Sequence, residues 1–125
     1  MAQILLAEDE SVLRMLITDT LEDEGHSVVE ACTGKEAVEL LETGKTFDLI
    51  ILDYMMPVYT GLEVITKMKT MNLRDFPPVL MLTAKSQQSV REEVLASGAS
   101  GFMSKPFSPM ELAERVEALL NEMEK

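Results

Sequence analysis

The chain has 125 residues, 46% of them hydrophobic and 26% charged, and its formal net charge is −11. That length is typical of a single domain with its own core, and the acidic balance argues against nucleic acid or an anionic membrane as a direct partner. No apolar run is long enough to cross a bilayer, and the N-terminus lacks the features of a signal peptide. Cys32 is the single cysteine, so no internal disulfide can form, which fits a reducing compartment. The sequence therefore predicts a cytoplasmic protein.

Short apolar runs alternate with amphipathic segments along the whole chain. Most of the runs are too short for helices and lack polar alternation, so they predict strands that are covered on both faces. The segments between them carry apolar residues at helical spacing. In chain order the sequence predicts strand 3–7, helix 11–24, strand 27–31, helix 35–42, strand 48–53, helix 61–71, strand 78–83, helix 88–96, strand 101–104 and helix 108–123.

Five strands that are each followed by a helix predict an α/β fold. The expected architecture is (βα)5, a doubly wound, five-stranded parallel sheet with helices on both faces and the flavodoxin-like strand order 2-1-3-4-5. The crossovers should be right-handed. No linker or change in composition divides the chain, so residues 1–125 are expected to form one domain.

Polar residues end the apolar runs at one edge of this sheet. The first predicted strand runs into Glu8 and Asp9, the third ends in Asp53, the fourth ends in Thr83, and Lys105 follows the fifth. In open parallel sheets, ligands bind outside the carboxyl ends of the strands. Each residue alone is ordinary for a strand end or a surface turn, and only their joint position indicates a site.

The chemistry of this residue set is that of phosphoryl transfer. Three carboxylates in one crevice repel each other unless a cation compensates, and Mg²⁺ prefers carboxylate oxygens, water and phosphate oxygens. Lys105 adds a positive charge on a flexible stem, and Thr83 adds a hydroxyl donor. A carboxylate nucleophile, a metal ion, a lysine and a hydrogen-bond donor are the parts that such a site needs.

Four motifs resemble the receiver domain of two-component response regulators. They are "ED" at 8–9, "DYMMP" at 53–57 with Gly61, "TA" at 83–84 and "KPF" at 105–107, and the resemblance covers essentially the whole chain, from Gln3 to about Met123. The stretches 78–84 and 98–102 look more like the stand-alone chemotaxis regulator. The acidic pair that winged-helix, DNA-binding members often carry at the positions of Ser100 and Gly101 is missing.

The resemblance implies a role for each residue at the sheet edge. Asp53 would accept a phosphoryl group from a histidine kinase or a histidine phosphotransfer protein. Asp9, Asp53 and the main-chain carbonyl of Met55 would bind Mg²⁺, with Glu8 helping through water. Lys105 would contact the phosphoryl group, across a cis Lys105–Pro106 bond.

A second set of implied residues would carry and time the signal. Thr83 would move to hydrogen-bond the phosphoryl oxygen, and Phe102 matches the aromatic residue that swings inward with it. Met55 and Lys85 border the path of the hydrolytic water, where many relatives carry polar or acidic residues. Because a methionine cannot orient water, we expect slow self-dephosphorylation.

The leading hypothesis is a single-domain signalling switch without an output domain, which is not an enzyme beyond catalysing its own phosphorylation and dephosphorylation. Its output would act through a protein partner that binds the face of the fourth helix, fifth strand and fifth helix. The chain itself would be a monomer or a weak, phosphorylation-dependent dimer. A relay intermediate that passes phosphate onward and a non-phosphorylated binding module are the alternatives, and the sequence leaves open whether a longer protein contains the chain. A Mg²⁺-dependent phosphatase is disfavoured, since such enzymes need an acid at the position of Met55.

Overall fold

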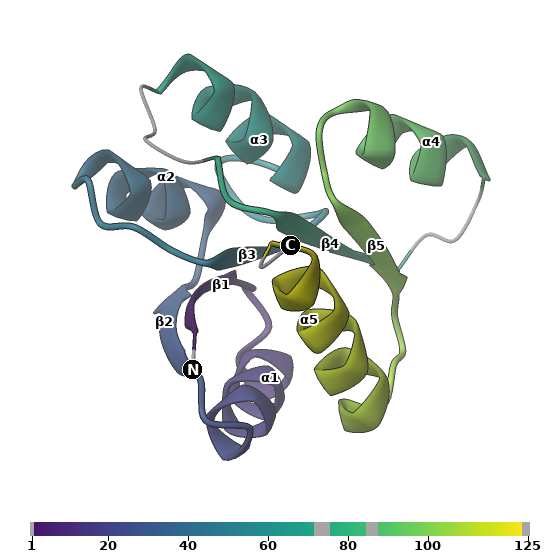
Figure 1. Cartoon of the computed structure of the whole chain (residues 1–125). Coiled ribbons are helices and arrows are strands. Elements are labelled where there is room, and N and C mark those ends of the chain that lie inside the picture. The colour runs from purple at the N-terminus through teal and green to yellow at the C-terminus, as the bar shows by residue number, and fades with distance from the viewer. Residues whose placement is uncertain (1, 72–75, 85–87, 124–125) are drawn as a thin grey trace.

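The structure, a computed structural model, describes residues 2–71, 76–84 and 88–123 (Figure 1). One parallel, five-stranded sheet forms its centre, with the strand order β2-β1-β3-β4-β5. The strands are β1 (Gln3–Ala7), β2 (Ser27–Ala31), β3 (Leu49–Asp53), β4 (Val79–Thr83) and β5 (Gly101–Ser104). The helices are α1 (Ser11–Asp23), α2 (Gly34–Glu42), α3 (Gly61–Thr70), α4 (Gln88–Ala96) and α5 (Pro109–Met123). The predicted fold class and strand order are confirmed, and every element is present within one residue of its predicted bounds.

The helices cover both faces of the sheet. Figure 1 shows α2, α3 and α4 on one side and α1 and α5 on the other. Alternate side chains of each strand point to opposite faces, so the strands contribute to two separate hydrophobic clusters. The cluster under α2, α3 and α4 includes Leu5, Ile50, Leu52 and Met81, and the one under α1 and α5 includes Ile4, Leu6, Ile51 and Leu80.

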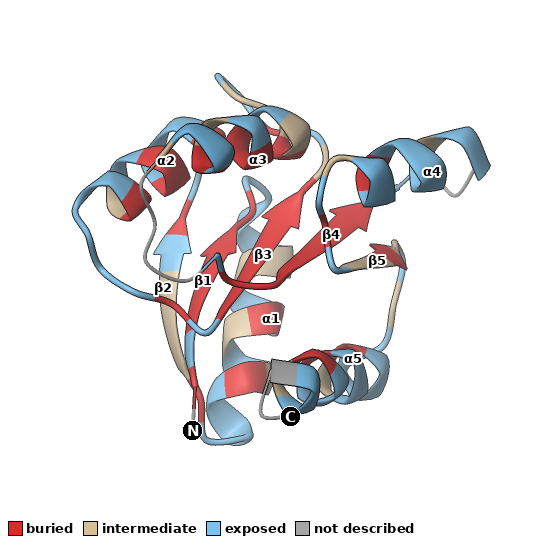
Figure 2. Ribbon diagram, turned by 45° about the horizontal axis from the view of Figure 1, so that its top comes forward, coloured by how far each residue is buried: buried red, intermediate tan, exposed pale blue. Residues whose placement is uncertain are grey.

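The three central strands are apolar because both of their faces are covered. All residues of β3 and β4 are buried, whereas the edge strands β2 and β5 are only partly so (Figure 2). A buried strand held on both sides by ladder hydrogen bonds is a rigid support. The side chains that follow the strands at their carboxyl ends therefore stand on the stiffest part of the molecule.

Gly61 allows the loop after β3 to return close to its strand. A Cβ atom at this position would lie 2.6 Å from the main-chain oxygen of Asp53 and 2.6 Å from the sulfur of Met81. Only glycine fits such a close approach. A capping box then starts α3, because Thr60 and Glu63 bond each other's backbone N–H groups at 3.2 and 3.0 Å.

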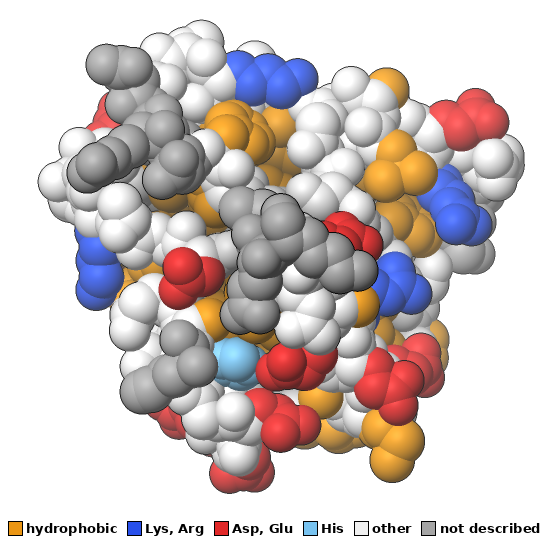
Figure 3. All heavy atoms as spheres, viewed as in Figure 1, with side chains coloured by type: hydrophobic (Ala, Val, Ile, Leu, Met, Phe, Trp, Pro, Cys, Tyr) orange, Lys and Arg blue, Asp and Glu red, His pale blue; other side chains and the backbone are white. Residues whose placement is uncertain are grey.

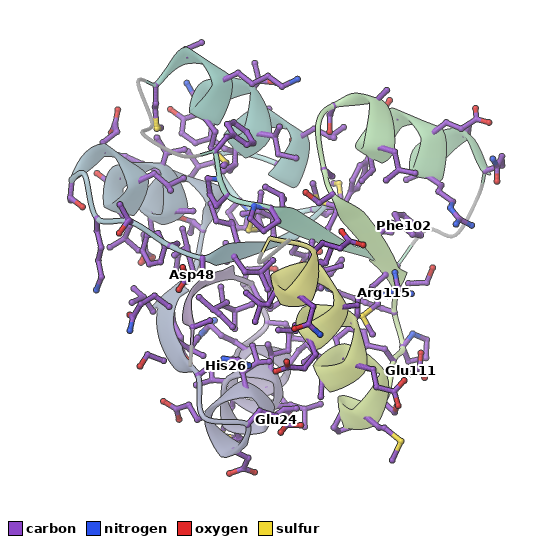
Figure 4. The ribbon with its side chains drawn as sticks, viewed as in Figure 1. Glu24, His26, Asp48, Phe102, Glu111 and Arg115 are labelled. Carbon is purple, nitrogen blue, oxygen red and sulfur yellow. The ribbon has the colours of Figure 1, made fainter. Side chains whose placement is uncertain are left out.

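A buried histidine fastens the opposite end of the sheet to α5. The backbone N–H of Ala2 donates to Nδ1 of His26 at 3.1 Å, so the ring carries its proton on Nε2, which donates to Glu117 at 3.1 Å. Figure 4 shows His26 below the sheet, beside α1. Among the described helices, none is both long and apolar enough to span a bilayer.

Candidate functional site

Four strand ends bring the predicted site residues to one edge of the sheet. Parallel pairing aligns Asp53 of β3 with Leu82 of β4, and Thr83 with Ser104 of β5. Glu8 directly follows β1, and its N–H continues the ladder by donating to the carbonyl of Ala31 at 3.1 Å. The register of the strands thus determines which polar side chains meet.

Two of the three carboxylates at this edge are withdrawn from solvent. Glu8 is fully buried, Asp53 is 5% exposed, and Asp9 is exposed. The Oε2 atom of Glu8 accepts the backbone N–H of Glu10 at 3.1 Å. A buried carboxylate without a positive partner would be costly, so the neighbourhood must supply one.

Lys105 is that partner, and it bridges both buried acids. Its Nζ lies 2.9 Å from Oε1 of Glu8 and 3.0 Å from Oδ2 of Asp53. The backbone N–H of Lys105 donates to the carbonyl of Thr83 at 2.8 Å, which places the lysine beside the end of β4. The Lys105–Pro106 peptide bond is cis, as the resemblance implied.

The site's electrostatics favour protonation of Glu8 and charge on Lys105. Burial is the largest cause that raises the pKa of Glu8, the hydrogen-bonded carboxyl of Asp53 raises it further, and Lys105 opposes this only in part, so the pKa is raised to about 7. For Lys105, burial alone would lower the pKa, but hydrogen bonds and charges from Glu8 and Asp53 outweigh it, and the pKa is raised. Two buried carboxylates therefore share the positive charge of one lysine.

The residues at this edge fit a magnesium ion. Glu8, Asp9 and Asp53 each place a carboxylate oxygen so that these atoms lie within 4.8 Å of one another. An all-oxygen set with one exposed and two buried carboxylates suits a hard cation that keeps some of its water. These three side chains would hold the ion, which would supply positive charge for the carboxylates and for an incoming phosphoryl group.

Of the remaining predicted residues, Thr83 and Met55 lie next to this centre, and Phe102 lies on the edge strand β5. Thr83 is 1% exposed at the end of β4. The N–H of Met55 donates to Oδ1 of Asp53 at 3.4 Å, and its side chain is 59% exposed. Phe102 is half-buried on β5, and its carbonyl accepts a hydrogen bond from Nη1 of Arg115 on α5 at 2.8 Å. Figure 4 shows the two residues side by side. Lys85 lies outside the described residues.

Sequence reasoning missed three features near Asp53. The hydroxyl of Tyr54 donates to Glu93 of α4, Nη1 of Arg14 donates to the carbonyl of Glu8 at 2.8 Å, and Val58 has a positive φ of 72°. The two hydrogen bonds join separate segments, so no local pattern announces them. Gly61 in the sequence indicates a tight loop after Asp53. It does not indicate that Val58 takes the left-handed conformation.

Comparison with known proteins decides the family. A sequence model of the response regulator receiver domain matches residues 4–117. The chain belongs to this family. It is the receiver domain of a two-component response regulator.

The curated relatives of the receiver domain include transcriptional regulators. The alkaline phosphatase synthesis transcriptional regulatory protein PhoP of Bacillus subtilis is 40% identical over 98% of the chain and 50% of its own length. The transcriptional regulatory protein SrrA of Staphylococcus aureus is 40% identical over 94% of the chain and 47% of its own length. The receiver domain thus spans about half the length of these relatives.

Solved structures repeat the same fold. The receiver domain of the Francisella response regulator 1452 superposes with a TM-score of 0.90 at 31% identity, over 98% of this chain and 99% of its own. The Vibrio cholerae chemotaxis protein CheY4 has a TM-score of 0.88 at 34% identity, over 95% and 98%. The receiver domain of the Pseudomonas aeruginosa sensor kinase PA1611, with a TM-score of 0.86 at 28% identity over 96% and 98%, holds a magnesium ion in its active-site cleft.

Proposed function

We propose that Asp53 is the phosphoacceptor of this receiver domain and that Mg²⁺ binds beside it. The proposal rests on the position of Asp53 between a lysine and two other acids. Its Oδ2 lies 3.0 Å from Nζ of Lys105, and its carboxylate forms a cluster with those of Glu8 and Asp9. An acid in this setting lies beside a positive charge and is aligned by a rigid strand. The phosphodonor is a phosphohistidine on a histidine kinase or a histidine phosphotransfer protein.

The transfer moves one phosphoryl group between two nucleophiles. A carboxylate oxygen of Asp53 forms a bond to phosphorus while the phosphorus–nitrogen bond to the donor imidazole breaks, and the imidazole nitrogen keeps the electron pair and takes up a proton. Lys105 then follows the new negative charge from the carboxylate to the phosphoryl oxygens. Thr83, one strand away, supplies a hydroxyl for the same oxygens.

The output is proposed to follow from Thr83 and Phe102. Phosphorylation biases a two-state element through local charge. Thr83 ends β4, and Phe102 on β5 packs against the same cluster as Val90 of α4 and bonds Arg115 of α5 through its carbonyl. A protein partner that binds the α4, β5 and α5 face would sense this change. Two alternatives remain for the chain itself: a relay intermediate that passes phosphate onward, or a receiver-like binding module that is not phosphorylated.

We further propose that residues 1–125 form a single domain, which is a monomer or a weak, phosphorylation-dependent dimer. This domain catalyses no reaction except its own phosphorylation and dephosphorylation. A protein rather than a nucleic acid is the partner of this domain, which the net charge of −11 supports. A cytoplasmic location belongs to the same proposal and rests on the single cysteine, which leaves no internal disulfide.

Incubation with acetyl phosphate, followed by intact-protein mass spectrometry, tests the acceptor. We expect a gain of one phosphoryl group that requires Mg²⁺ and disappears after chelation. Asp53→Asn, which keeps the size of the side chain and removes the nucleophilic carboxylate, should gain none. A phosphoryl group of equal abundance on Asp53→Asn would place the acceptor elsewhere, and no adduct on the parent protein at any Mg²⁺ concentration would support the binding module instead.

A further inference from the structure

A tyrosine hydroxyl joins the loop after Asp53 to α4. Tyr54 follows Asp53 directly, and its backbone N–H donates to the carbonyl of Leu82 at 2.7 Å. Its hydroxyl donates to Oε1 of Glu93 at 2.7 Å, across 39 positions of sequence. This distance is in the normal range for an O–H···O bond, and a carboxylate acceptor makes such a bond stronger than a neutral one. The residue beside the candidate acceptor is therefore bonded to the helix whose face is the proposed output surface.

Little else anchors α4 to the domain. Val94 is the one buried side chain of this helix, all nine residues of which are described. Val90 is half-buried and packs against the same hydrophobic cluster as Tyr54 and Phe102. Because the position of a helix depends mainly on the apolar surface that it buries, one hydrogen bond carries more weight for α4 than it would for a deeply packed helix.

We propose that Tyr54 and Glu93 are positioning residues, whose hydrogen bond holds α4 against the phosphoacceptor loop in the unphosphorylated protein and is released when Asp53 is phosphorylated. Glu93 lies in the second half of α4, the first element after Thr83, so its bond to Tyr54 opposes any change at Thr83 that displaces this helix. A contact that exists in one state only shifts the equilibrium away from the other state. The bond therefore opposes phosphorylation and sets how strongly the α4 face responds to it. This inference rests on the proposed function of Asp53.

The competing explanation is a surface contact that persists in both states. Such a contact would stabilise the fold, but its removal would leave the rate of phosphoryl transfer unchanged. Two readouts together separate the explanations: amide hydrogen exchange within α4 in the unphosphorylated protein, and the rate of Asp53 phosphorylation by acetyl phosphate.

The chain offers matched variants. Tyr54→Phe removes only the donor, Glu93→Ala removes only the acceptor, and Glu93→Gln keeps an acceptor oxygen and should restore most of the parental behaviour. Tyr59→Phe is the control for loss of a hydroxyl, since Tyr59 lies in the same loop with its ring against Lys67. Glu92→Ala is the control for loss of charge on α4, because Glu92 accepts from Gln88 of its own helix.

We expect Tyr54→Phe and Glu93→Ala each to raise exchange in α4 and to speed phosphorylation by a similar factor, about fivefold for one net hydrogen bond. The double variant should gain no more than either single variant, because both changes remove the same bond. Tyr59→Phe and Glu92→Ala should match the parent in both readouts.

Three results would overturn the inference. They are unchanged exchange in α4, faster exchange with an unchanged phosphorylation rate, and additive effects in the double variant. Failure of the proposed function would look different, because the parent protein itself would gain no phosphoryl group. In that event the rate part of the inference fails with it, and α4 exchange still shows whether Tyr54 and Glu93 hold the helix.

Discussion

At the scale of single residues, the site depends on an acid that the fold buries completely. Glu8 sits at the end of β1 with no exposed surface, and Lys105 and Asp53 are its neighbours. Its pKa of about 7, against an ordinary 4.5, means that the folded, metal-free protein binds this proton more tightly than the unfolded chain does. The carboxylates are thus arranged for a cation rather than for stability on their own.

This arrangement predicts a pH dependence in the metal-free protein. The stability that the Glu8 proton contributes is fully present below about pH 4.5 and is lost as the pH rises through about 7. In the presence of a chelator, the free energy of unfolding of the parent should therefore fall relative to that of Glu8→Gln between pH 5 and pH 8, by roughly 2 kcal/mol. Urea unfolding at several pH values measures both proteins. A difference that does not change with pH would show that Glu8 is not the titrating group.

Met55 provides a second prediction at this scale. Its side chain is 59% exposed beside Asp53, and a thioether neither donates to water nor orients it. Met55→Asn supplies a donor and an acceptor there, so the phosphorylated form should decay faster, by about three- to tenfold. The decay is followed by mass after the phosphodonor is removed. Met110→Asn, at an exposed methionine on α5, is the control, and an unchanged decay in Met55→Asn would contradict the role of position 55.

At the scale of elements, the loop between β3 and α3 holds a strained residue. Val58 has a φ of 72°, and the N–H of Tyr59 reaches back across it to the carbonyl of Pro57 at 2.9 Å. A β-branched residue is rarely found in this region, because its side chain crowds the backbone. Val58 is 64% exposed, so burial of its side chain gives little in return for the strain.

Relief of this strain should stabilise the domain. Val58→Gly removes the steric conflict, worth about 1–3 kcal/mol, and adds flexibility to the unfolded chain, which costs up to about 1 kcal/mol. We expect the free energy of unfolding to rise by about 1 kcal/mol, as measured by urea denaturation. Val58→Ala keeps a Cβ atom and should gain less. A loss of stability in Val58→Gly would mean that the valine side chain makes contacts that outweigh the strain.

Most of the elements could be predicted because each has a local cause. Continuous apolar runs indicate strands that are covered on both faces, and the polar residues at their ends are brought together by the parallel arrangement alone. The contacts of Tyr54 with Glu93 and of His26 with Glu117 could not be predicted, because they join positions 39 and 91 residues apart through the exact packing of helices on the sheet. The left-handed conformation of Val58 was hidden because that residue type disfavours it.

At the scale of the whole molecule, negative charge dominates. The net charge is −11, and on the face drawn in Figure 3 acidic side chains gather over α1 and α5. Asp23, Glu24, Glu114 and Glu117 line the groove between these two helices. Such a molecule attracts cations in general, so a specific metal site has to be distinguished from screening by salt.

Magnesium should stabilise the whole fold through its three carboxylates. A ligand that binds only the folded state stabilises it by about 2.7 kcal/mol at a hundredfold excess over Kd, and here it also relieves the repulsion among Glu8, Asp9 and Asp53. The melting temperature should therefore rise with the logarithm of the Mg²⁺ concentration and return to its starting value after chelation. Asp9→Asn, which alters the exposed member of the cluster, should lose most of this rise, whereas Glu114→Gln, which removes one charge from the groove between α1 and α5, should keep it.

At matched ionic strength, NaCl should have a much smaller effect, because screening acts on all surface charges and not on three convergent oxygens. An equal rise in Asp9→Asn, or with NaCl, would assign the stabilisation to general screening and remove the support for a magnesium site at this edge of the sheet.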